Sequence, residues 1–180
     1  MSQSPAALFR GLFETHLHVA DLERAMGFYG EVLGLEPGLH QEERRAAFYW
    51  IGKDRGAMLG LWEKPPWVSA SGNRLPPQRT KAAGDPADAN KVLPQHLAFA
   101  VDFPDLMTAI DHLKQRGIEL RDFFDRVAGE PSVFGWIPAA SIYFNDGDGH
   151  LLEFIARLEG EPAPEIGVVS LTEWRQLHAR

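Results

Sequence analysis

The feature that most constrains the fold of this 180-residue chain is an internal repeat. The segment "AAFYWIGKDRGAMLGLWE", residues 46–63, aligns with "AASIYFNDGDGHLLEFIA", residues 139–156, at an offset of 93. Upstream, "ETHLHV" at 14–19 aligns with "HLAFAV" at 96–101 at an offset of 82. The alternative is chance similarity between two amphipathic hairpins. Agreement in order, element type and turn position favours a true repeat.

Each repeat predicts a strand, a helix and further strands. Asp21 can cap a helix whose apolar side chains recur every three to four residues, and Gly34 suits the left-handed position that ends it. In the second repeat the corresponding helix ends at Gly117. The strands predicted from alternation and turn signals are 12–19, 45–52 and 56–63, then 96–101, 118–124, 139–145 and 150–157. The sequence therefore predicts an α+β fold of two βαβββ modules.

The modules are separated by a stretch of different composition. Residues 1–63 form the first module and 94–157 the second, while 64–93 are rich in Pro, Gly, Ala and Asp and show no periodicity. Such a segment is a linker or a lid, and Trp67 is the reason to consider a lid. Residues 158–180 predict a C-terminal extension with a short helix, in which Ser170 and Glu173 form a capping box. We expect one structural domain overall.

Composition excludes several classes of function. The net charge is -7 and no cluster of Lys and Arg stands out, which argues against a nucleic-acid or anionic-membrane partner. The chain has no cysteine, so disulfides, thiolate nucleophiles and Cys-ligated metals are excluded. The N-terminal sequence lacks the pattern of a signal peptide, and no window approaches the roughly 18 apolar residues of a membrane span. We expect a cytoplasmic enzyme or binding protein.

Strand alternation separates the residues that face the helices from those that face away. In the first strand Leu17 and Val19 suit the helix side, so the Glu and the two His of "ETHLHV" point to the other face. By the same argument His96 in the second module and Glu153 in its last strand point away from the helix. By these arguments Glu14, His96 and Glu153 can share one concave face, whereas His150, in the turn before the last strand, is expected to be exposed.

Two stretches, "HLHVADLERAMGFYGEVLGLE" and "FNDGDGHLLEF", resemble the vicinal oxygen chelate superfamily. This superfamily includes glyoxalase I, extradiol dioxygenases, fosfomycin-resistance thiol transferases, methylmalonyl-CoA epimerases and bleomycin-resistance proteins. The resemblance covers roughly residues 12–157, excepting the linker. It implies that the two modules pair to form an open barrel around one cavity. It is specific for the fold and says little about the reaction, because one fold hosts many chemistries.

The resemblance also implies a metal site. The family's ligand positions fall here on Glu14, Gly60, His96 and Glu153; glycine has no ligand to offer, which leaves three. Glu14 departs from the more common His or Gln. One imidazole and two carboxylates suit a divalent ion such as Fe, Mn, Zn, Ni or Mg, with open positions for substrate oxygens. The alternative is that the fold persists without the metal and that Glu14 only pairs with His96.

Further residues on this face are candidates for catalysis and substrate binding. His16 and His18 are candidate proton carriers, and His16 is also a candidate extra ligand or hydrogen-bond partner of Glu14. By resemblance to fosfomycin-resistance members, Ser141 and Tyr143 face the cavity and orient substrate, although Tyr143 is as easily explained by packing. The candidate aromatic wall, which alternatively fills the first half-barrel, consists of Phe48, Trp50, Met58 and Trp62.

The leading hypothesis is a metal-dependent enzyme that binds a small-molecule substrate through two neighbouring oxygens. The step would be of the lyase, isomerase or dioxygenase type. One alternative is a non-catalytic, bleomycin-resistance-like protein that sequesters an apolar ligand. A second is a thiol transferase whose thiol comes from a cosubstrate, because the chain has no Cys. We expect a monomer or homodimer, and the two repeats favour pairing of the modules within the chain.

Overall fold

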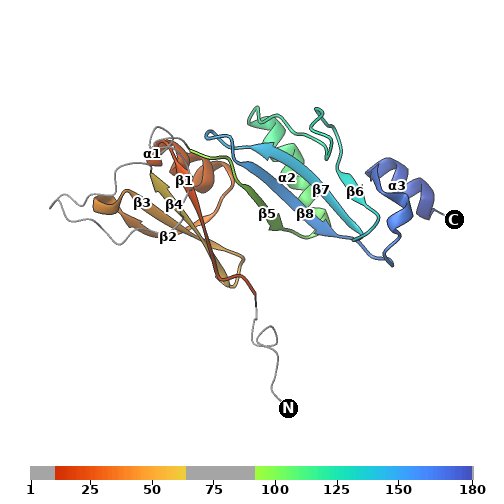
Figure 1. Cartoon of the computed structure of the whole chain (residues 1–180), viewed down its shortest axis with the longest axis horizontal. Coiled ribbons are helices and arrows are strands. Elements are labelled where there is room, and N and C mark those ends of the chain that lie inside the picture. The colour runs from red at the N-terminus through yellow and green to blue at the C-terminus, as the bar shows by residue number, and fades with distance from the viewer. Residues whose placement is uncertain (1–10, 64–91, 180) are drawn as a thin grey trace, which may run out of the picture. The chain divides into compact units, whose positions relative to one another are not determined.

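The computed structural model describes residues 11–63 and 92–179 of the chain. Internal contacts divide the chain into two compact units, Met1–Leu93 and Pro94–Arg180, called unit 1 and unit 2 below. Each unit contains one mixed sheet and its own helices, which confirms the α+β class (Figure 1). The predicted linker or lid, including Trp67, falls outside the described residues apart from its last two positions. None of the helices in the described ranges is long and apolar enough to cross a membrane.

Unit 1 contains a four-stranded sheet in the order β1-β4-β3-β2. Strand β1 runs parallel to β4, and the other neighbours are antiparallel. The parallel edge is formed by the first and last strands of the repeat, as a βαβββ module requires. The elements are β1 (Glu14–Val19), α1 (Leu22–Met26), the π-helix η2 (Gly27–Val32), β2 (Glu36–Gln41), the 3-10 helix η3 (Glu42–Arg44), β3 (Ala46–Ile51) and β4 (Ala57–Glu63).

The helical segment of unit 1 begins and ends where the sequence predicts. The Asp21 carboxylate accepts a hydrogen bond of 2.8 Å from the backbone N–H of Arg24, and Gly34 has a φ of 71°. The single predicted α-helix instead changes to a π-helix at Gly27. Strand β2 escaped sequence analysis, because an exposed edge strand interrupted by Pro37 and Gly38 lacks alternation.

Unit 2 contains a five-stranded sheet in the order β5-β8-β7-β6-β9, again with a parallel pair of first and last module strands, β5 and β8. The fifth strand, β9, comes from the C-terminal extension and pairs with β6. The elements are β5 (His96–Ala100), α2 (Phe103–Gln115), β6 (Ser132–Phe134), β7 (Ala139–Asn145), β8 (Leu151–Arg157), the 3-10 helix η5 (Pro164–Ile166), β9 (Val168–Ser170) and α3 (Leu171–His178).

One predicted strand of unit 2 is wrong. Residues 118–124 form no strand; only isolated bridges join Arg121 to Val127 and to Tyr143. The cause is Asp122, whose carboxylate accepts hydrogen bonds from the backbone N–H groups of Phe124 and Arg126 and folds the segment into a turn. Strand β6 takes its place in the sheet.

The C-terminal cap and the second hairpin turn test two smaller expectations. The Ser170 hydroxyl accepts a hydrogen bond of 3.1 Å from the Glu173 backbone N–H, as the capping box predicts. The expected exposure of His150 is wrong, because its side chain is fully buried. Its Nδ1 accepts a hydrogen bond of 3.1 Å from the Gln95 backbone N–H, and Asp146 accepts from its own N–H. His150 therefore fastens the turn to the start of β5.

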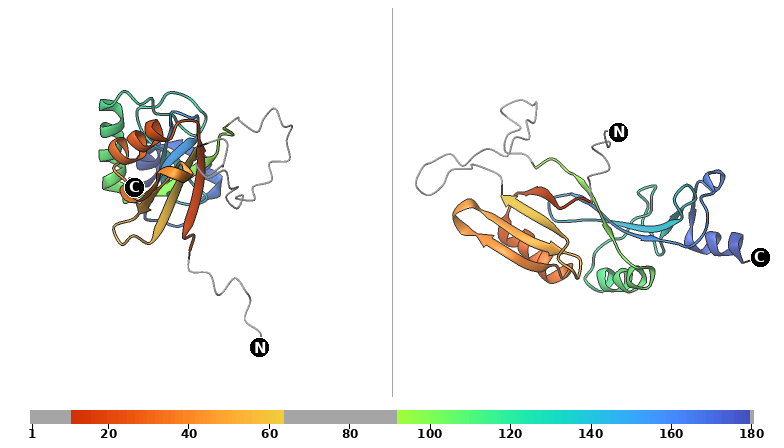
Figure 2. Two further views of the ribbon diagram at one scale, coloured as in Figure 1. Left: turned by 90° about the vertical axis from the view of Figure 1, so that its left-hand side faces the viewer. Right: turned by 90° about the horizontal axis from the view of Figure 1, so that it is seen from below.

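In both units the module's own helices lie against one face of the sheet (Figure 2). The residues that fill the space between sheet and helix alternate along the strands, as the sequence pattern predicts. They include Leu17, Val19, Leu22, Tyr29, Leu59 and Leu61 in unit 1, and Phe99, Leu106, Ile110, Leu113, Ile142, Phe144 and Leu152 in unit 2. The opposite face of each sheet carries the candidate site residues.

The β3–β4 hairpin of unit 1 and the β7–β8 hairpin of unit 2 differ in register. Against the first strand, Glu14 pairs with Met58 and His96 with Leu151, which matches the predicted offset of 93 for the last strands. Across the hairpin, however, Gly60 pairs with Phe48, whereas Glu153 pairs with Tyr143. The offset of 93 is therefore wrong for β3 and β7. Tyr143, rather than Ser141, is the counterpart of Phe48, because the pairing of β7 with β8 is shifted by two residues relative to that of β3 with β4.

Candidate functional site

In unit 2 the face of the sheet opposite α2 is centred on a buried carboxylate. Glu153, on β8, is only 4% exposed. Its Oε2 lies 2.8 Å from Nε2 of His96, and its Oε1 accepts a hydrogen bond from the fully buried Ser141 hydroxyl. The strand partner of Glu153 on β5 is Ala98, whose small side chain leaves room for His96 to reach diagonally across. The carboxylate is thus held from two sides by defined partners.

Tyr143 lies next to this carboxylate, since it is the residue paired with Glu153 across β7 and β8. Burial and the negative charge of Glu153 together raise the pKa of the Tyr143 phenol to about 12. The hydroxyl therefore stays protonated at neutral pH and can donate a hydrogen bond. The rings of Tyr143 and His96 are 6.0 Å apart, so imidazole, carboxylate and phenol form one cluster.

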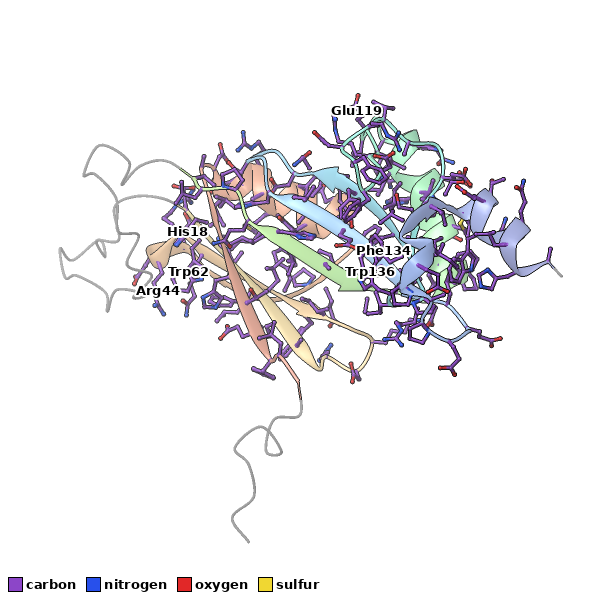
Figure 3. The ribbon with its side chains drawn as sticks, turned by 45° about the vertical axis from the view of Figure 1, so that its right-hand side comes forward. His18, Arg44, Trp62, Glu119, Phe134 and Trp136 are labelled. Atoms are coloured by element: carbon purple, nitrogen blue, oxygen red, sulfur yellow. The ribbon has the colours of Figure 1, made fainter. Side chains whose placement is uncertain are left out.

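An apolar cluster adjoins these polar groups. Phe134 and Tyr143 belong to one buried cluster, and the Phe134 ring stacks on Trp136 with centroids 4.9 Å apart (Figure 3). The ring of Phe123 contacts both in edge-on geometry, and Trp136 remains 45% exposed. Sequence reasoning missed this cluster because it predicted no strand between residues 124 and 139, where "AGEPSVFGW" lies. Its signal was the alternation of Ser132 and Phe134, which puts Phe134 on the face of Ser141.

In unit 1 the corresponding face carries a second imidazole–carboxylate pair. Glu14 and His16 lie two residues apart on β1, and Oε1 of Glu14 is 3.1 Å from Nε2 of His16. Both side chains are accessible, with 39% of the Glu14 side chain and 24% of the His16 side chain exposed. This pair is formed along a single strand, and proximity to Glu14 is one of the alternatives considered for His16.

Gly60 explains how His16 reaches this position. The two residues are paired across β1 and β4, and a Cβ added at Gly60 would lie only 2.6 Å from Cδ2 of His16. The imidazole thus occupies the space that a side chain on β4 would need. Gly60 itself offers no metal ligand, but the imidazole of His16 on the neighbouring strand lies over it.

The candidate aromatic wall of unit 1 packs largely against itself. Trp62 is only 3% exposed, and its ring lies 5.6 Å from His16 and 5.5 Å from Phe48. The guanidinium of Arg44 lies over the indole at 4.9 Å, and His18 is the strand partner of Trp62 (Figure 3). Trp62 is therefore buried, and these contacts all come from its own unit. The two remaining members, Trp50 and Met58, are partly exposed strand partners and approach Gly38.

These residues fit a divalent metal ion as two pairs rather than as one cluster. Within 11–63 and 92–179, no three His, Asp or Glu side chains gather closely enough to hold an ion. Ligands about 2.1 Å from an ion and at right angles are about 3 Å apart, close to the two N–O separations found here. Ser141, on the second Glu153 oxygen, supplies the outer support that ligating carboxylates use. Whether Glu14 lies near His96 and Glu153 depends on how the two units pair, so this stays a prediction.

Solved structures similar to this chain support the same fold. An integron cassette protein from the mobile metagenome of Halifax Harbour sewage outfall is 29% identical, with a TM-score of 0.60 over 82% of this chain and 99% of that chain. The oxidase ChaP-H2 is 21% identical, with a TM-score of 0.60 over 87% of this chain and 100% of that chain. The lactoylglutathione lyase of Agrobacterium tumefaciens is 21% identical, with a TM-score of 0.57 over 83% of this chain and 95% of that chain.

Comparison at the level of sequence families gives the assignment. No curated protein matches the chain. A family model described as the Glyoxalase/Bleomycin resistance protein/Dioxygenase superfamily matches residues 11–154, which include the sheet of unit 1, most of the sheet of unit 2 and both imidazole–carboxylate pairs. Strand β9 and helix α3 lie beyond that match. The chain belongs to the glyoxalase/bleomycin resistance protein/dioxygenase superfamily.

Proposed function

We propose that this protein is a metal-dependent enzyme that binds a small substrate through two neighbouring oxygens. The observation that carries the proposal is that each unit holds one imidazole–carboxylate pair on the face opposite its helices. We assign the predicted ligands Glu14, His96 and Glu153, and add His16 because its Nε2 faces Glu14 from above Gly60. Both pairs serve one ion in this proposal.

The donor set suits an ion of intermediate or hard character. Two imidazoles and two carboxylates accept Fe, Mn, Zn, Ni or Mg, and availability decides between them. When bound, the ion supplies a Lewis acid that polarises a substrate oxygen and stabilises developing negative charge. Each residue then keeps a defined task. Ser141 fixes the orientation of Glu153, since its hydroxyl holds the Oε1 oxygen.

Proton handling is assigned to residues beside the ligands. The raised pKa of Tyr143 keeps its phenol protonated, so it donates a hydrogen bond to a substrate oxygen near Glu153. His18 lies on the same face of β1 as Glu14 and is the proposed proton carrier. His16, engaged with Glu14, acts as a ligand instead. The similar lyase and oxidase structures support a lyase, isomerase or oxidative step.

Metal titration of the purified protein tests the proposal. Metal-free protein is titrated with each of the five ions by calorimetry, and bound metal is counted by elemental analysis. We expect one ion per chain, and Glu14→Gln, His96→Ala and Glu153→Gln should each weaken binding at least about tenfold. Glu161→Gln, an exposed carboxylate of the C-terminal extension, is the matched control and should bind as the wild type does.

Two outcomes contradict the proposal. Absence of saturable binding for all five ions removes the metal. Two ions per chain, one lost with Glu14→Gln and the other with Glu153→Gln, would show that the pairs serve separate ions and not a shared one.

The non-catalytic alternative has one observation in its favour. The partly exposed rings of Phe123 and Trp136 beside buried Phe134 suit a planar, apolar ligand. A resistance-type protein that sequesters such a ligand would keep its affinity in Glu153→Gln and lose it in Trp136→Ala. The enzyme requires the reverse dependence, with turnover lost in Glu153→Gln. The thiol-transferase alternative stays a prediction, and turnover without added thiol would exclude it.

A further inference from the structure

Two consecutive arginines in unit 1, Arg44 and Arg45, differ in the groups that surround their guanidinium groups. The guanidinium of Arg45 lies 2.6 Å from Glu23 and 2.5 Å from Glu63, and also contacts Glu42 at 3.2 Å. Arg44 has no carboxylate within ion-pair distance in the described ranges of the chain. Its contacts there are a hydrogen bond of 3.2 Å to the Gln41 side chain and the face of the Trp62 ring.

The backbone explains why the two side chains diverge. Arg45 ends η3 in the left-handed conformation, with a φ of 47°, immediately before β3. Its side chain reaches the helix side of the sheet, where Glu63 also accepts the Leu22 backbone N–H. Arg44 falls on the opposite side with Trp62. The end of η3 and its left-handed cap therefore send one arginine to a structural ion cluster and the other to the candidate site face.

The surroundings of Arg44 favour a bound anion. Its positively charged guanidinium is partly buried, and burying an unmatched charge is costly. Its Nε is buried and has no hydrogen-bond partner among the residues that the structure describes. Stacking on Trp62 and the bond to Gln41 hold the planar group in place. A fixed guanidinium fork binds carboxylate and phosphate oxygens in pairs.

The position of Arg44 links it to the proposed metal ligands. Trp62, beneath the guanidinium, has its ring 5.6 Å from the imidazole of His16, which in turn contacts Glu14. His18 is the strand partner of Trp62, and Figure 3 shows His18, Trp62 and Arg44 together at one end of the unit 1 sheet. One continuous row of side chains thus joins Glu14 to Arg44.

We propose that Arg44 binds an oxyanion of the substrate, a carboxylate or a phosphate, at the end of this row. The substrate class of the proposed enzyme is then an anionic small molecule, with metal-binding oxygens at one end and the charged group at the other. This assignment of the oxyanion to a substrate rests on the proposed function. Binding of the oxyanion itself requires only unit 1 residues.

Titration with two simple probes tests the site. Benzoate and inorganic phosphate are added to metal-free protein at constant ionic strength, and binding is followed by the indole NMR signal of Trp62, assigned with Trp62→Phe. We expect saturable shifts for at least one probe. Arg44→Gln should weaken binding about tenfold or more, and Arg44→Lys should fall between, because it keeps the charge and loses the fork. Arg55→Gln, an exposed arginine paired with Glu36, is the control and should leave affinity unchanged.

The possible results separate this inference from the metal proposal. Saturable binding that survives Glu153→Gln but not Arg44→Gln supports the oxyanion site whether or not a metal binds. Absence of saturable shifts with both probes, or equal affinity in Arg44→Gln and wild type, overturns it. If metal titration succeeds while these probes fail, the oxyanion site falls and the metal proposal stands.

Discussion

Both units place an imidazole beside a carboxylate, but they build this pair from different strands. Unit 1 builds its imidazole–carboxylate pair along one strand, from Glu14 and His16 of β1. Unit 2 builds its pair across the parallel edge, from His96 of β5 and Glu153 of β8. The difference teaches that the repeat preserves the face on which these groups lie, while the strand that supplies each group can change.

Small residues make both arrangements possible. In unit 1, Gly60 leaves space above β4 that the imidazole of His16 fills. In unit 2, Ala98 sits beside Glu153 and leaves the diagonal path to His96 open. In unit 1 the first strand carries His16 and its partner on the last strand is Gly60. In unit 2 the last strand carries Glu153 and its partner on the first strand is Ala98. At these corresponding positions, each unit therefore combines one large polar side chain with one small residue on the neighbouring strand.

The largest expected effect compares the two carboxylates by stability. Removing Glu153, which is 4% exposed, leaves the buried Ser141 hydroxyl with only the longer bond of 3.3 Å to the Phe154 carbonyl, so Glu153→Ala should lower the free energy of unfolding by about 2 kcal/mol. Removing Glu14, on an exposed strand end, should cost about 0.5 kcal/mol or less. Urea unfolding of the metal-free variants measures both.

The double variant Glu153→Ala with Ser141→Ala gives the control for this prediction. It removes the Ser141 hydroxyl, which would keep only its longer bond to the Phe154 carbonyl, together with the carboxylate, so it should recover part of the lost stability. Equal costs for Glu14→Ala and Glu153→Ala would show that the difference in burial does not matter, and would break the comparison between the units.

A smaller effect is expected from filling the space above β4. The Cβ of Gly60→Ala would meet His16 at 2.6 Å and the Trp62 indole nitrogen at 3.1 Å, so the imidazole must move away from Glu14. Because the end of a His side chain can rotate, we expect a loss of only about 1 kcal/mol in stability. In metal titration, however, Gly60→Ala should behave like His16→Ala.

Gly27→Ala is the matched control for that substitution. A Cβ at Gly27, in the helical segment of the same unit, meets no atom within 4 Å. It should leave metal affinity unchanged and raise helix stability by roughly 0.5–1 kcal/mol. If Gly60→Ala keeps wild-type metal affinity, His16 does not act as a ligand from this position.

The sequence contains most of the information that defines each unit. Alternation in β1 and β8 identified the site face, and the residues flanking the first helix, Asp21 and Gly34, were predicted as its cap and its stop. These features are local, because period and capping are written in neighbouring residues. The same holds for the C-terminal cap at Ser170.

What escaped sequence analysis depends on contacts between distant residues. The shift that pairs Tyr143 with Glu153 is a difference in hairpin register, which an alignment by offset cannot detect. The burial of His150 depends on Gln95. The turn at Asp122 is an exception, because it is closed by a local carboxylate that replaces strand pairing. The role of Gly60 became visible only through the ring of His16.

The smallest expected effect concerns the helix side, where the units differ again. In unit 2, α2 buries the apolar side chains of Leu106, Ile110 and Leu113. In unit 1, the shorter α1 is joined to the sheet by Arg45, whose hydrogen bonds lower the pKa of Glu23 from 4.5 to about 2. Since the folded state holds this carboxylate ionised, its contribution is present above pH 4.5 and is lost as the pH falls toward about 2.

The size of this contribution is limited by solvent, because the Glu23 side chain is 63% exposed. We therefore expect a few tenths of a kcal/mol rather than the value that the pKa shift alone would give. Urea unfolding of wild type and Glu23→Gln at pH values above and within this window measures it. The stability difference between the two proteins should shrink as the pH falls. A constant difference would mean that Arg45 holds α1 through Glu63 and not through Glu23, because Glu63 also accepts the Leu22 backbone N–H at the start of the helix.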